Sequence, residues 1–108
     1  MDPQTINIGK DFHPAPAGRT PDDGPYSGEA FRKRMLLPAL GNSSVVVVEL
    51  GDLEGYGSSF LEEAFGGIVR DGKFTAHQLH DKLRLQSKND PSVVAEIWSY
   101  IDEAKPTR

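Results

Sequence analysis

VVVVELGDLEGYGSSFLEEAFGG, residues 45–67, decides the fold of this 108-residue chain. The β-branched run at its start, bounded by turn-forming residues, predicts a strand over 45–50 that is covered on both faces. After the turn at 55–57, Ser59 and Glu62 have the spacing of a capping box, which predicts the start of a helix. A strand of this kind belongs in a sheet flanked by helices.

The helix predicted after Ser59 has one apolar face, because its apolar residues recur at helical spacing. These residues are Leu61, Ala64, Phe65 and Ile68. Gly66 and Gly67 interrupt the helix, and each costs about 1 kcal/mol relative to alanine. We therefore expect at least one of them to pack tightly against another backbone or a partner, where a side chain cannot fit.

Towards the N-terminus, Ile6 and Ile8 alternate with polar residues, so a short first strand is predicted within 5–12. Residues 13–24 hold three prolines and two glycines, and this composition predicts a long loop over 13–26. Loops of this length in small domains tend to be functional or mobile.

Ser27 is a suitable N-cap for the helix that follows this loop. Phe31 and Met35 are expected to face inward and residues 32–34, Arg-Lys-Arg, mostly outward as a solvated face. Pro38 is expected to kink or end this helix, and Gly41 to stop it.

Beyond residue 70, the chain predicts two more helices with a short strand between them. Thr75 can cap a helix that runs to Lys82, and Leu83 and Leu85 fit a strand. Asp90 and Pro91 open the last helix, which frays over 105–108. Strands that alternate with helices predict an α/β fold with a small mixed or parallel sheet flanked by helices, in one domain spanning 1–108.

Charge and composition exclude several classes of protein. Twelve Lys and Arg stand against sixteen Asp and Glu, which gives a net charge of −4 and a pI near 5.3. Direct binding of nucleic acid is therefore not expected. No apolar run approaches the roughly 20 residues of a membrane span, and no secretory signal is visible, so a cytoplasmic location is expected. Without cysteine, the chain has no disulfide, zinc–thiolate site or cysteine nucleophile.

Catalytic motifs are missing from the sequence: it has no nucleophile elbow, P-loop or dinucleotide fingerprint. The adjacent carboxylates Glu62 and Glu63 diverge on a helix and make no acid–base pair. His77 and His80 have a spacing compatible with two metal ligands, but we interpret them as surface histidines. We expect no enzymatic activity, no cofactor and no metal.

Two clusters could bind an anion or a partner. At Gly57–Ser58–Ser59, the unpaired N–H groups of a helix start favour an anion or a phosphorylated side chain, although both serines are also explained as cap and turn residues. A second cluster joins a turn, a tyrosine and a helix start, and is either a binding loop for a phosphate, nucleotide or acidic partner, or only a capped helix with its entry loop. Its residues are Arg19, Gly24, Tyr26, Ser27 and Gly28.

Residues 45–69 resemble the strand–turn–helix core of STAS domains, the anti-sigma-factor-antagonist fold. The resemblance is closer to a STAS-like family of unknown function, which has runs similar to Gly18-Arg19 and to residues 23–31 and 57–63, and it extends roughly from Ile6 to the last helix. In the antagonists a partner kinase phosphorylates one serine of the pair. The resemblance thus implies Ser59 as the phosphorylated residue, with Ser58 as the alternative.

The chain departs from the classical antagonists at two positions. Gly57 stands where an aspartate usually precedes the serine pair, and Phe60 where a glycine usually follows it. Both departures concern phosphorylation and leave the predicted fold unchanged.

The leading hypothesis is a non-catalytic regulatory module, of bacterial or phage origin, that binds a kinase or ATPase-type regulator. Its partner surface would comprise the helix from Ser59 and the loop near Tyr26. The candidate residues are Arg19, Gly24, Tyr26, Ser27, Gly28, Gly57, Phe60, Glu62 and Glu63. Two alternatives stay open: a phage-encoded inhibitor of a host defence complex, similar to anti-CRISPR proteins, and a small sensor of anions or nucleotides. Homo-oligomerisation also stays open.

Overall fold

A computed structural model describes residues 2–107 and contains one sheet of three parallel strands. The strands are β1 (Gln4–Asn7), β2 (Val46–Glu49) and β3 (Leu83–Gln86), in the order β1-β2-β3. Ile6 lies opposite Val48, and Val48 opposite Leu85. The predicted α/β class is confirmed, and of the two predicted sheet types the parallel one is present.

Helices connect the strands and complete the chain. The first crossover is one continuous helix over residues 28–42, made of α1 (Gly28–Phe31), the π-type segment η3 (Arg32–Leu36) and α2 (Leu37–Asn42). The second contains a continuous helix over 58–70, made of α3 (Ser58–Leu61), η4 (Glu62–Gly66) and α4 (Gly67–Arg70), followed by α5 (Ala76–Lys82). Helix α6 (Pro91–Glu103) comes last, and two short turns, η1 (Ile8–Phe12) and η2 (Pro21–Asp23), precede α1.

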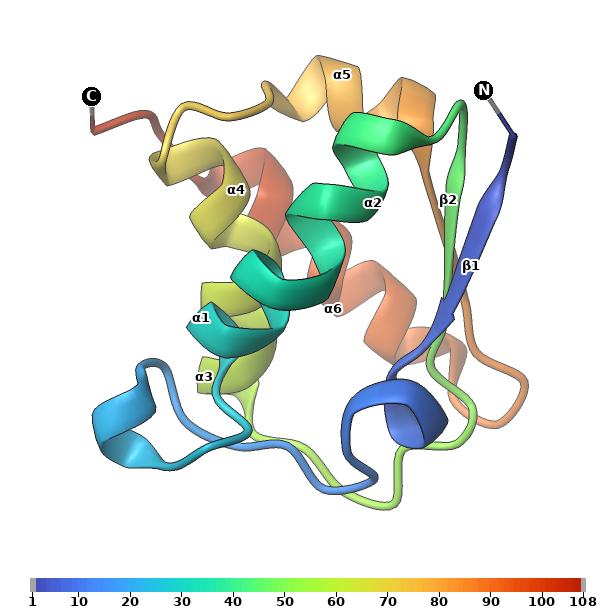
Figure 1. Cartoon of the computed structure of the whole chain (residues 1–108), viewed down its shortest axis with the longest axis vertical. Helices are drawn as coiled ribbons and strands as arrows, with labels where there is room; N and C mark the ends of the chain where they lie inside the picture. Colours follow the sequence, from blue (N-terminus) through green and yellow to red (C-terminus); the bar gives the residue numbers. More distant parts are fainter. Residues whose placement is uncertain (1, 108) are drawn as a thin grey trace.

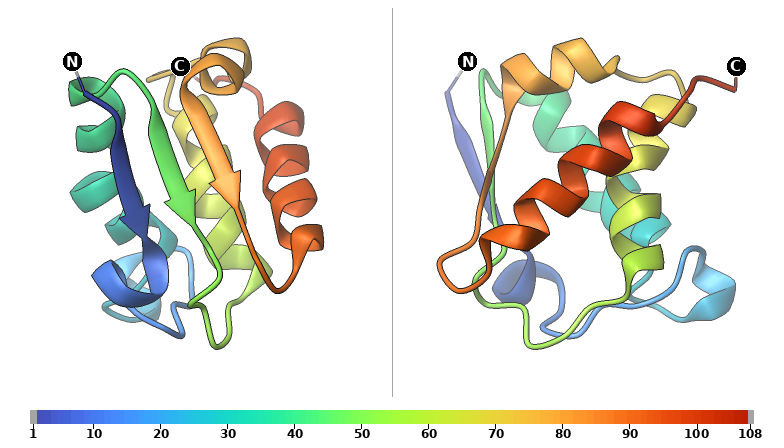
Figure 2. Two further views of the ribbon diagram at one scale, coloured as in Figure 1. Left: turned by 90° about the vertical axis from the view of Figure 1, so that its right-hand side faces the viewer. Right: turned by 180° about the vertical axis from the view of Figure 1, so that it is seen from behind.

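All the long helices lie on one face of the sheet (Figures 1 and 2). The prediction that β2 is covered on both faces is therefore wrong: Val46 and Val48 are buried, whereas Val47 and Glu49 are partly exposed on the open face. The reason is topological. Each crossover adds the next strand on the same side of the sheet, so two right-handed crossovers place their helices on the same face.

The core lies between this inner face and the helices. Its largest fully buried side chains include Phe31, Phe60 and Phe65. All four apolar residues predicted for the inner face of helix 58–70 are fully buried, so that face was predicted correctly.

Among residues 2–107, no helix has the length and apolar character that crossing a bilayer requires.

The first strand is shorter than the predicted 5–12 segment, because the chain turns at Ile8. Asn7 caps the turn η1 by accepting a hydrogen bond from the Lys10 N–H at 3.0 Å. Gly9 lies in this turn against Asp52, where a Cβ would be only 2.2 Å from the Asp52 carbonyl oxygen. Close contact with the loop after β2 therefore replaces further sheet pairing.

Pro38 was predicted to kink or end its helix, and it does not end it, since the helix continues to Asn42. The segment immediately before it, η3, has π-type hydrogen bonding. A proline has no N–H to donate, and a locally widened turn accommodates both that loss and the bulk of the ring. The stop predicted at Gly41 is correct to within one residue.

The capping box predicted for Ser59 and Glu62 is also absent. Gly57 is the N-cap of α3, no side chain caps this helix, and Ser59 lies inside it. The Glu62 carboxylate instead accepts hydrogen bonds from Arg19 and Arg70. Two guanidinium groups thus donate charge-assisted hydrogen bonds to this carboxylate, whereas a capping box would supply one backbone N–H.

The predicted starts of the last two helices are confirmed: Thr75 and Gln78 form a capping box, and the Asp90 side chain caps α6. Of the predicted frayed tail, 105–107 has no regular structure, but the Thr107 N–H donates to the Arg70 carbonyl at 3.1 Å and so attaches this segment to α4. Arg108, like Met1, lies outside the described residues.

Ser27→Ala is expected to lower the free energy of unfolding by about 1–2 kcal/mol. The buried Ser27 hydroxyl accepts a hydrogen bond from the Ala30 N–H at 3.2 Å, and its loss leaves a helix-start amide unsatisfied. Urea unfolding measures the change. Ser59→Ala is the matched control and should stay within about 0.5 kcal/mol of the wild type. Equal losses in both variants would mean that Ser59, too, caps its helix.

Candidate functional site: a loop–helix surface

The loop 13–26 and the turn 51–57 lie side by side at the end of the molecule where helices 28–42 and 58–70 begin (Figure 1). The Pro14 carbonyl accepts hydrogen bonds from the N–H groups of Glu54 and Gly55, at 2.7 and 3.3 Å. The long loop is also closed on itself, because the Ala17 N–H donates to the Tyr26 carbonyl at 3.1 Å. We call this region the loop–helix surface. It comprises Arg19, Tyr26, Tyr56, Ser58, Ser59, Glu62 and Glu63.

Two tyrosines provide its aromatic part. Tyr26 is 39 % exposed and Tyr56 37 %, and these are the large hydrophobic residues that the described chain leaves exposed. The Tyr26 ring stacks on His13 with 4.0 Å between centroids and meets Phe12 edge-on at 5.6 Å. Phe12 in turn packs on Phe31, so Tyr26 is anchored to the core. Rigid, exposed aromatic side chains are typical of protein–protein hot spots.

The two serines at the start of α3 have different surroundings. The Ser58 hydroxyl donates to a Glu96 carboxylate oxygen at 3.1 Å, and that oxygen also accepts from the Tyr100 hydroxyl at 2.5 Å. The bond to the Glu96 carboxylate raises the pKa of Tyr100. Ser59 is exposed, and within residues 2–107 its side chain makes no cap bond or other hydrogen bond. Ser58 is therefore tied to α6, whereas Ser59 is open to solvent.

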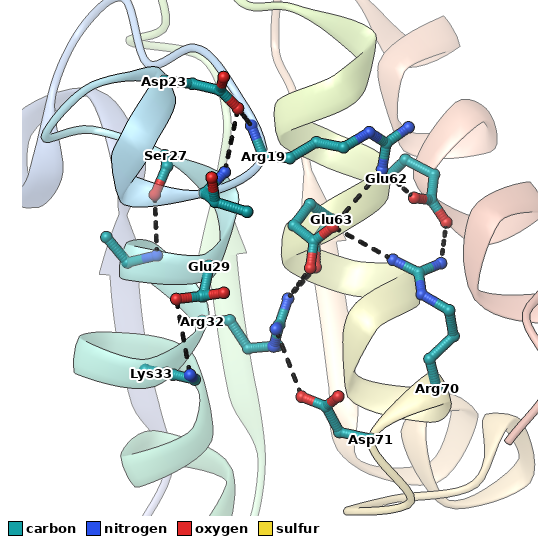
Figure 3. A network of polar contacts seen from close by, with 12 residues as sticks. Arg19, Asp23, Ser27, Glu29, Arg32, Lys33, Glu62, Glu63, Arg70 and Asp71 are labelled. Atoms are coloured by element: carbon teal, nitrogen blue, oxygen red, sulfur yellow. Dashed lines mark hydrogen bonds and ion pairs between the residues drawn. The ribbon is translucent and has the colours of Figure 1, made fainter. Parts of the chain in front are cut away.

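Beside these serines, three arginines alternate with three carboxylates (Figure 3). They are Arg19, Arg32 and Arg70, and Glu62, Glu63 and Asp71. Arg19 lies 2.5 Å from Glu62 and 3.5 Å from Glu63, so it ties the loop to helix 58–70. Arg70 contacts the same two carboxylates from about two turns further along the helix.

These contacts shift the pKa values of Glu62 and Arg19. Burial raises the pKa of Glu62, but hydrogen bonds from Arg70 and Arg19 outweigh it, so the pKa lies below its usual value. The hydrogen bond to Glu62 raises the pKa of Arg19. A carboxyl whose pKa is lowered by folding stabilises the protein above its unfolded pKa, and this contribution is lost as the pH falls through the folded pKa.

Arg32 was predicted to face outward with Lys33 and Arg34, and for Arg32 this is wrong. Its side chain is only 3 % exposed, whereas its two neighbours are exposed. The guanidinium lies between helices 28–42 and 58–70, 3.1 Å from Glu63 and 3.3 Å from Asp71, and also donates to the Glu63 carbonyl. Burial is possible because the facing helix supplies two carboxylates and the space beside a glycine.

Three predicted partner-binding residues are not on the surface. Ser27, Gly28 and Phe60 are buried, because Ser27 caps α1, Gly28 lies against helix 58–70 and Phe60 fills the core. Gly24 and Gly57 are partly exposed turn positions. Of the remaining candidates, Arg19, Glu62 and Glu63 are in direct contact (Figure 3), whereas Tyr26 belongs to the loop 13–26, and Ser58 and Ser59 belong to the first turn of helix 58–70.

The sequence analysis did not identify Tyr56, Arg70 or Glu96 as part of this site. Tyr56 carried a local signal, since a tyrosine between two glycines in a turn is poorly placed to be buried. The desolvation of its partly covered ring, together with the negative charges of Glu96 and Asp90, raises the pKa of Tyr56. Glu96 had no such signal, because it lies 38 residues from the Ser58 that it binds.

His77 and His80 are surface residues with separate partners. His77 lies 3.8 Å from Asp81, while His80 lies 2.7 Å from Asp102 and stacks on Trp98 with 4.2 Å between ring centroids. Within the described residues, no group of three or more potential ligand side chains could hold a metal ion.

A comparison with known protein families identifies the family of this chain. A protein-family model described as a STAS-like domain of unknown function matches residues 27–93. The chain belongs to this STAS-like family. The match begins at the N-cap Ser27 and ends early in α6, so it is shorter than the predicted extent from Ile6 and leaves out Arg19 and Tyr26. No curated protein and no solved structure matches the chain.

Proposed function

We propose that this STAS-like domain is a non-catalytic regulatory module that binds a protein partner through the loop–helix surface and is controlled by the charge on Ser59. The observation that carries the proposal is an exposed serine without a hydrogen-bond partner in the first turn of a helix, on the same surface as the exposed Tyr26 and Tyr56. The tyrosines supply contact area, and the serine supplies a place where charge can change.

Ser59 suits this role better than Ser58. A phosphate on Ser58 would replace a hydroxyl that donates to Glu96 and would place like charges together. The Ser59 hydroxyl is bonded to no carboxylate in the described chain, and Glu62 and Glu63, its neighbours on the helix, are paired with arginines. An anion in the first helical turn is also favoured by the helix dipole. A partner kinase would transfer the γ-phosphoryl group of ATP to the Ser59 Oγ: a P–O bond forms, the hydroxyl proton is released and ADP leaves.

The polar network also favours binding over catalysis. Each of its carboxylates is paired with at least one arginine of the same chain, and Glu62 is held ionised. A carboxylate whose pKa is lowered, as that of Glu62 is, is a poor proton donor or acceptor near neutral pH. The paired carboxylates fix the position of the loop and of helix 58–70 instead, which presents a defined surface to a partner.

Ser59→Asp is expected to weaken partner binding at least tenfold, equivalent to about 1.4 kcal/mol. A partner is first captured from the native cells with the wild-type protein and identified by mass spectrometry, and its dissociation constants are then measured by calorimetry. Ser59→Asn is the matched control, because asparagine has nearly the size of aspartate without its charge. It should leave binding within twofold.

A second pair of variants tests the surface itself. Tyr26→Ala and Tyr56→Ala should each weaken the same interaction, because each removes an exposed aromatic side chain of the loop–helix surface. If Ser59→Asp and both tyrosine variants bind the partner as tightly as the wild type, the loop–helix surface is not the interface and the proposal is wrong. In a separate measurement, mass spectrometry of the protein recovered from its native cells shows whether Ser59 or Ser58 carries the phosphate.

A further inference from the structure

The arginine–carboxylate network carries no net charge, and one of its members, Arg19, belongs to a loop. Three guanidinium groups face three carboxylates, which gives a net charge of zero. The exposed fractions of the arginine side chains are 46 % for Arg19, 29 % for Arg70 and 3 % for Arg32. Arg70 and Arg32 belong to helices, whereas Arg19 belongs to the loop 13–26. Arg19 is thus the arginine of the three that can move with the least disruption of the core.

The position of Arg19 along helix 58–70 brings it near Ser59. Glu62 and Glu63 follow Ser59 by three and four residues, so the three side chains are neighbours on the helix surface. Helical side chains also tilt towards the N-terminus, which carries both glutamates over the turn that holds Ser59. The Arg19 guanidinium, 2.5 Å from Glu62 and 3.5 Å from Glu63, therefore lies beside that turn.

We propose that Arg19 responds to the charge on Ser59. A phosphate on Ser59 binds the Arg19 guanidinium in place of Glu62 and Glu63, and the loop that carries Arg19 moves with it. The inference rests on the proposed function for the presence of the phosphate. A phosphate adds about −1.5 to −2 charges to a network that is now neutral. It also binds a guanidinium in a bidentate manner, and Glu62 and Glu63 each keep another arginine when Arg19 leaves.

Hydrogen bonds join the residues around Arg19 to one another and to the start of α1, where the N–H groups of Gly28 and Glu29 donate to the Gly18 and Arg19 carbonyls, both at 2.9 Å. The Asp23 carboxylate accepts hydrogen bonds from the N–H groups of Arg19 and Thr20, at 2.9 and 3.2 Å. The hydrogen bond from Thr20, followed by the one from Arg19, lowers the pKa of Asp23, so its carboxylate is ionised near neutral pH. Gly18, at φ +89°, allows the tight turn before Arg19. Since Ala17 is bonded to Tyr26, a shift of Arg19 reaches an exposed tyrosine of the partner surface.

The test uses the full chain with phosphoserine incorporated at position 59 during translation, so that no kinase is needed. The second pKa of the phosphate, ordinarily about 6, is measured by ³¹P NMR titration. It should fall by about one unit in the wild-type background, because an opposite charge favours the dianion, and return in Arg19→Gln. Lys33→Gln is the matched control: Lys33 is an exposed cation paired with Glu29, outside the network, and its loss should leave the pKa unchanged.

Amide hydrogen exchange gives a second readout. Phosphoserine at 59 should change the exchange of residues 18–24 several-fold, and Arg19→Gln should abolish this change. Phosphoserine at 58 should show no dependence on Arg19. If the phosphate pKa and the loop exchange are the same with and without Arg19 in folded protein, the inference is wrong, even if charge on Ser59 controls partner binding. If Arg19 binds the phosphate but partner binding ignores it, the proposed function is wrong instead.

Discussion

Gly28→Ala is expected to lower the free energy of unfolding by about 3 kcal/mol, a large part of the stability of a domain of this size. Gly28 is the first residue of α1 and lies against helix 58–70. A Cβ there would be 2.6 Å from the Phe60 carbonyl oxygen, 2.8 Å from the Glu63 Cβ and 2.9 Å from the Ala64 nitrogen. Two of these atoms are backbone, so the added methyl group forces the helices apart and loosens the core between them.

Gly41→Ala is the matched control for this experiment. It makes the same substitution near the other end of the same helix, where a Cβ would meet nothing within 4 Å. Alanine should therefore stabilise the protein by up to about 1 kcal/mol through its higher helix propensity. Urea unfolding followed by the fluorescence of Trp98, the single tryptophan, measures both variants. Similar stabilities for the two variants would show that the helices do not make the close contact described.

The burial of Gly28 also bears on function. Gly28 was predicted to bind a partner directly, and its position between the helices gives it an indirect role instead. By setting the separation of the two helices, it sets the positions of Tyr26, just before α1, and of Ser59, in α3. A partner that contacts both therefore depends on this glycine without touching it.

Local signals predicted most of the helices and strands. The spacing of apolar residues indicates which face of a strand or helix is buried. The buried side chains that were expected on this basis include Val46, Val48, Leu61 and Phe65. The caps at Ser27 and Asp90 were also predicted, since an N-cap needs only the residue and the few that follow it. These features depend on at most a few turns of chain.

Features that depend on distant segments could not be predicted in this way. The open outer face of the sheet follows from the order of the strands and the hand of the crossovers, which no single strand encodes. Glu62 has the right spacing for a capping box with Ser59, but Arg19, 43 residues earlier, takes part in binding its carboxylate. The burial of Arg32 likewise depends on the carboxylates and the glycine of the facing segment, which the residue pattern of its own helix does not indicate.

The second large effect concerns the two glycines of helix 58–70, which the sequence predicted to differ. Gly67→Ala should lower the free energy of unfolding by about 2–3 kcal/mol, because a Cβ would lie 2.1 Å from a nitrogen of the buried Arg32 guanidinium and displace it. The close neighbour of Gly67 is thus a side chain, not the backbone or partner that the sequence analysis expected. At Gly66 a Cβ would approach the flexible carboxylate end of Glu62 at 2.6 Å. Gly66→Ala should stay within about 1 kcal/mol of the wild type, because the gain in helix propensity offsets moving that carboxylate.

A double-mutant cycle with Arg32→Met separates this account from a general intolerance of alanine at position 67. Methionine fills the space of the arginine stem and removes the Nε atom, which is buried without a hydrogen-bond partner in the described chain. Glu63 keeps Arg19 and Arg70, and Asp71 is partly exposed to water, so this replacement should cost less than Gly67→Ala. In the Arg32→Met background, Gly67→Ala should become nearly neutral, with a coupling energy of about 1.5 kcal/mol or more from urea unfolding. Additive effects would show instead that the methyl group at 67 clashes with something other than Arg32, and that the guanidinium is not what the glycine makes room for.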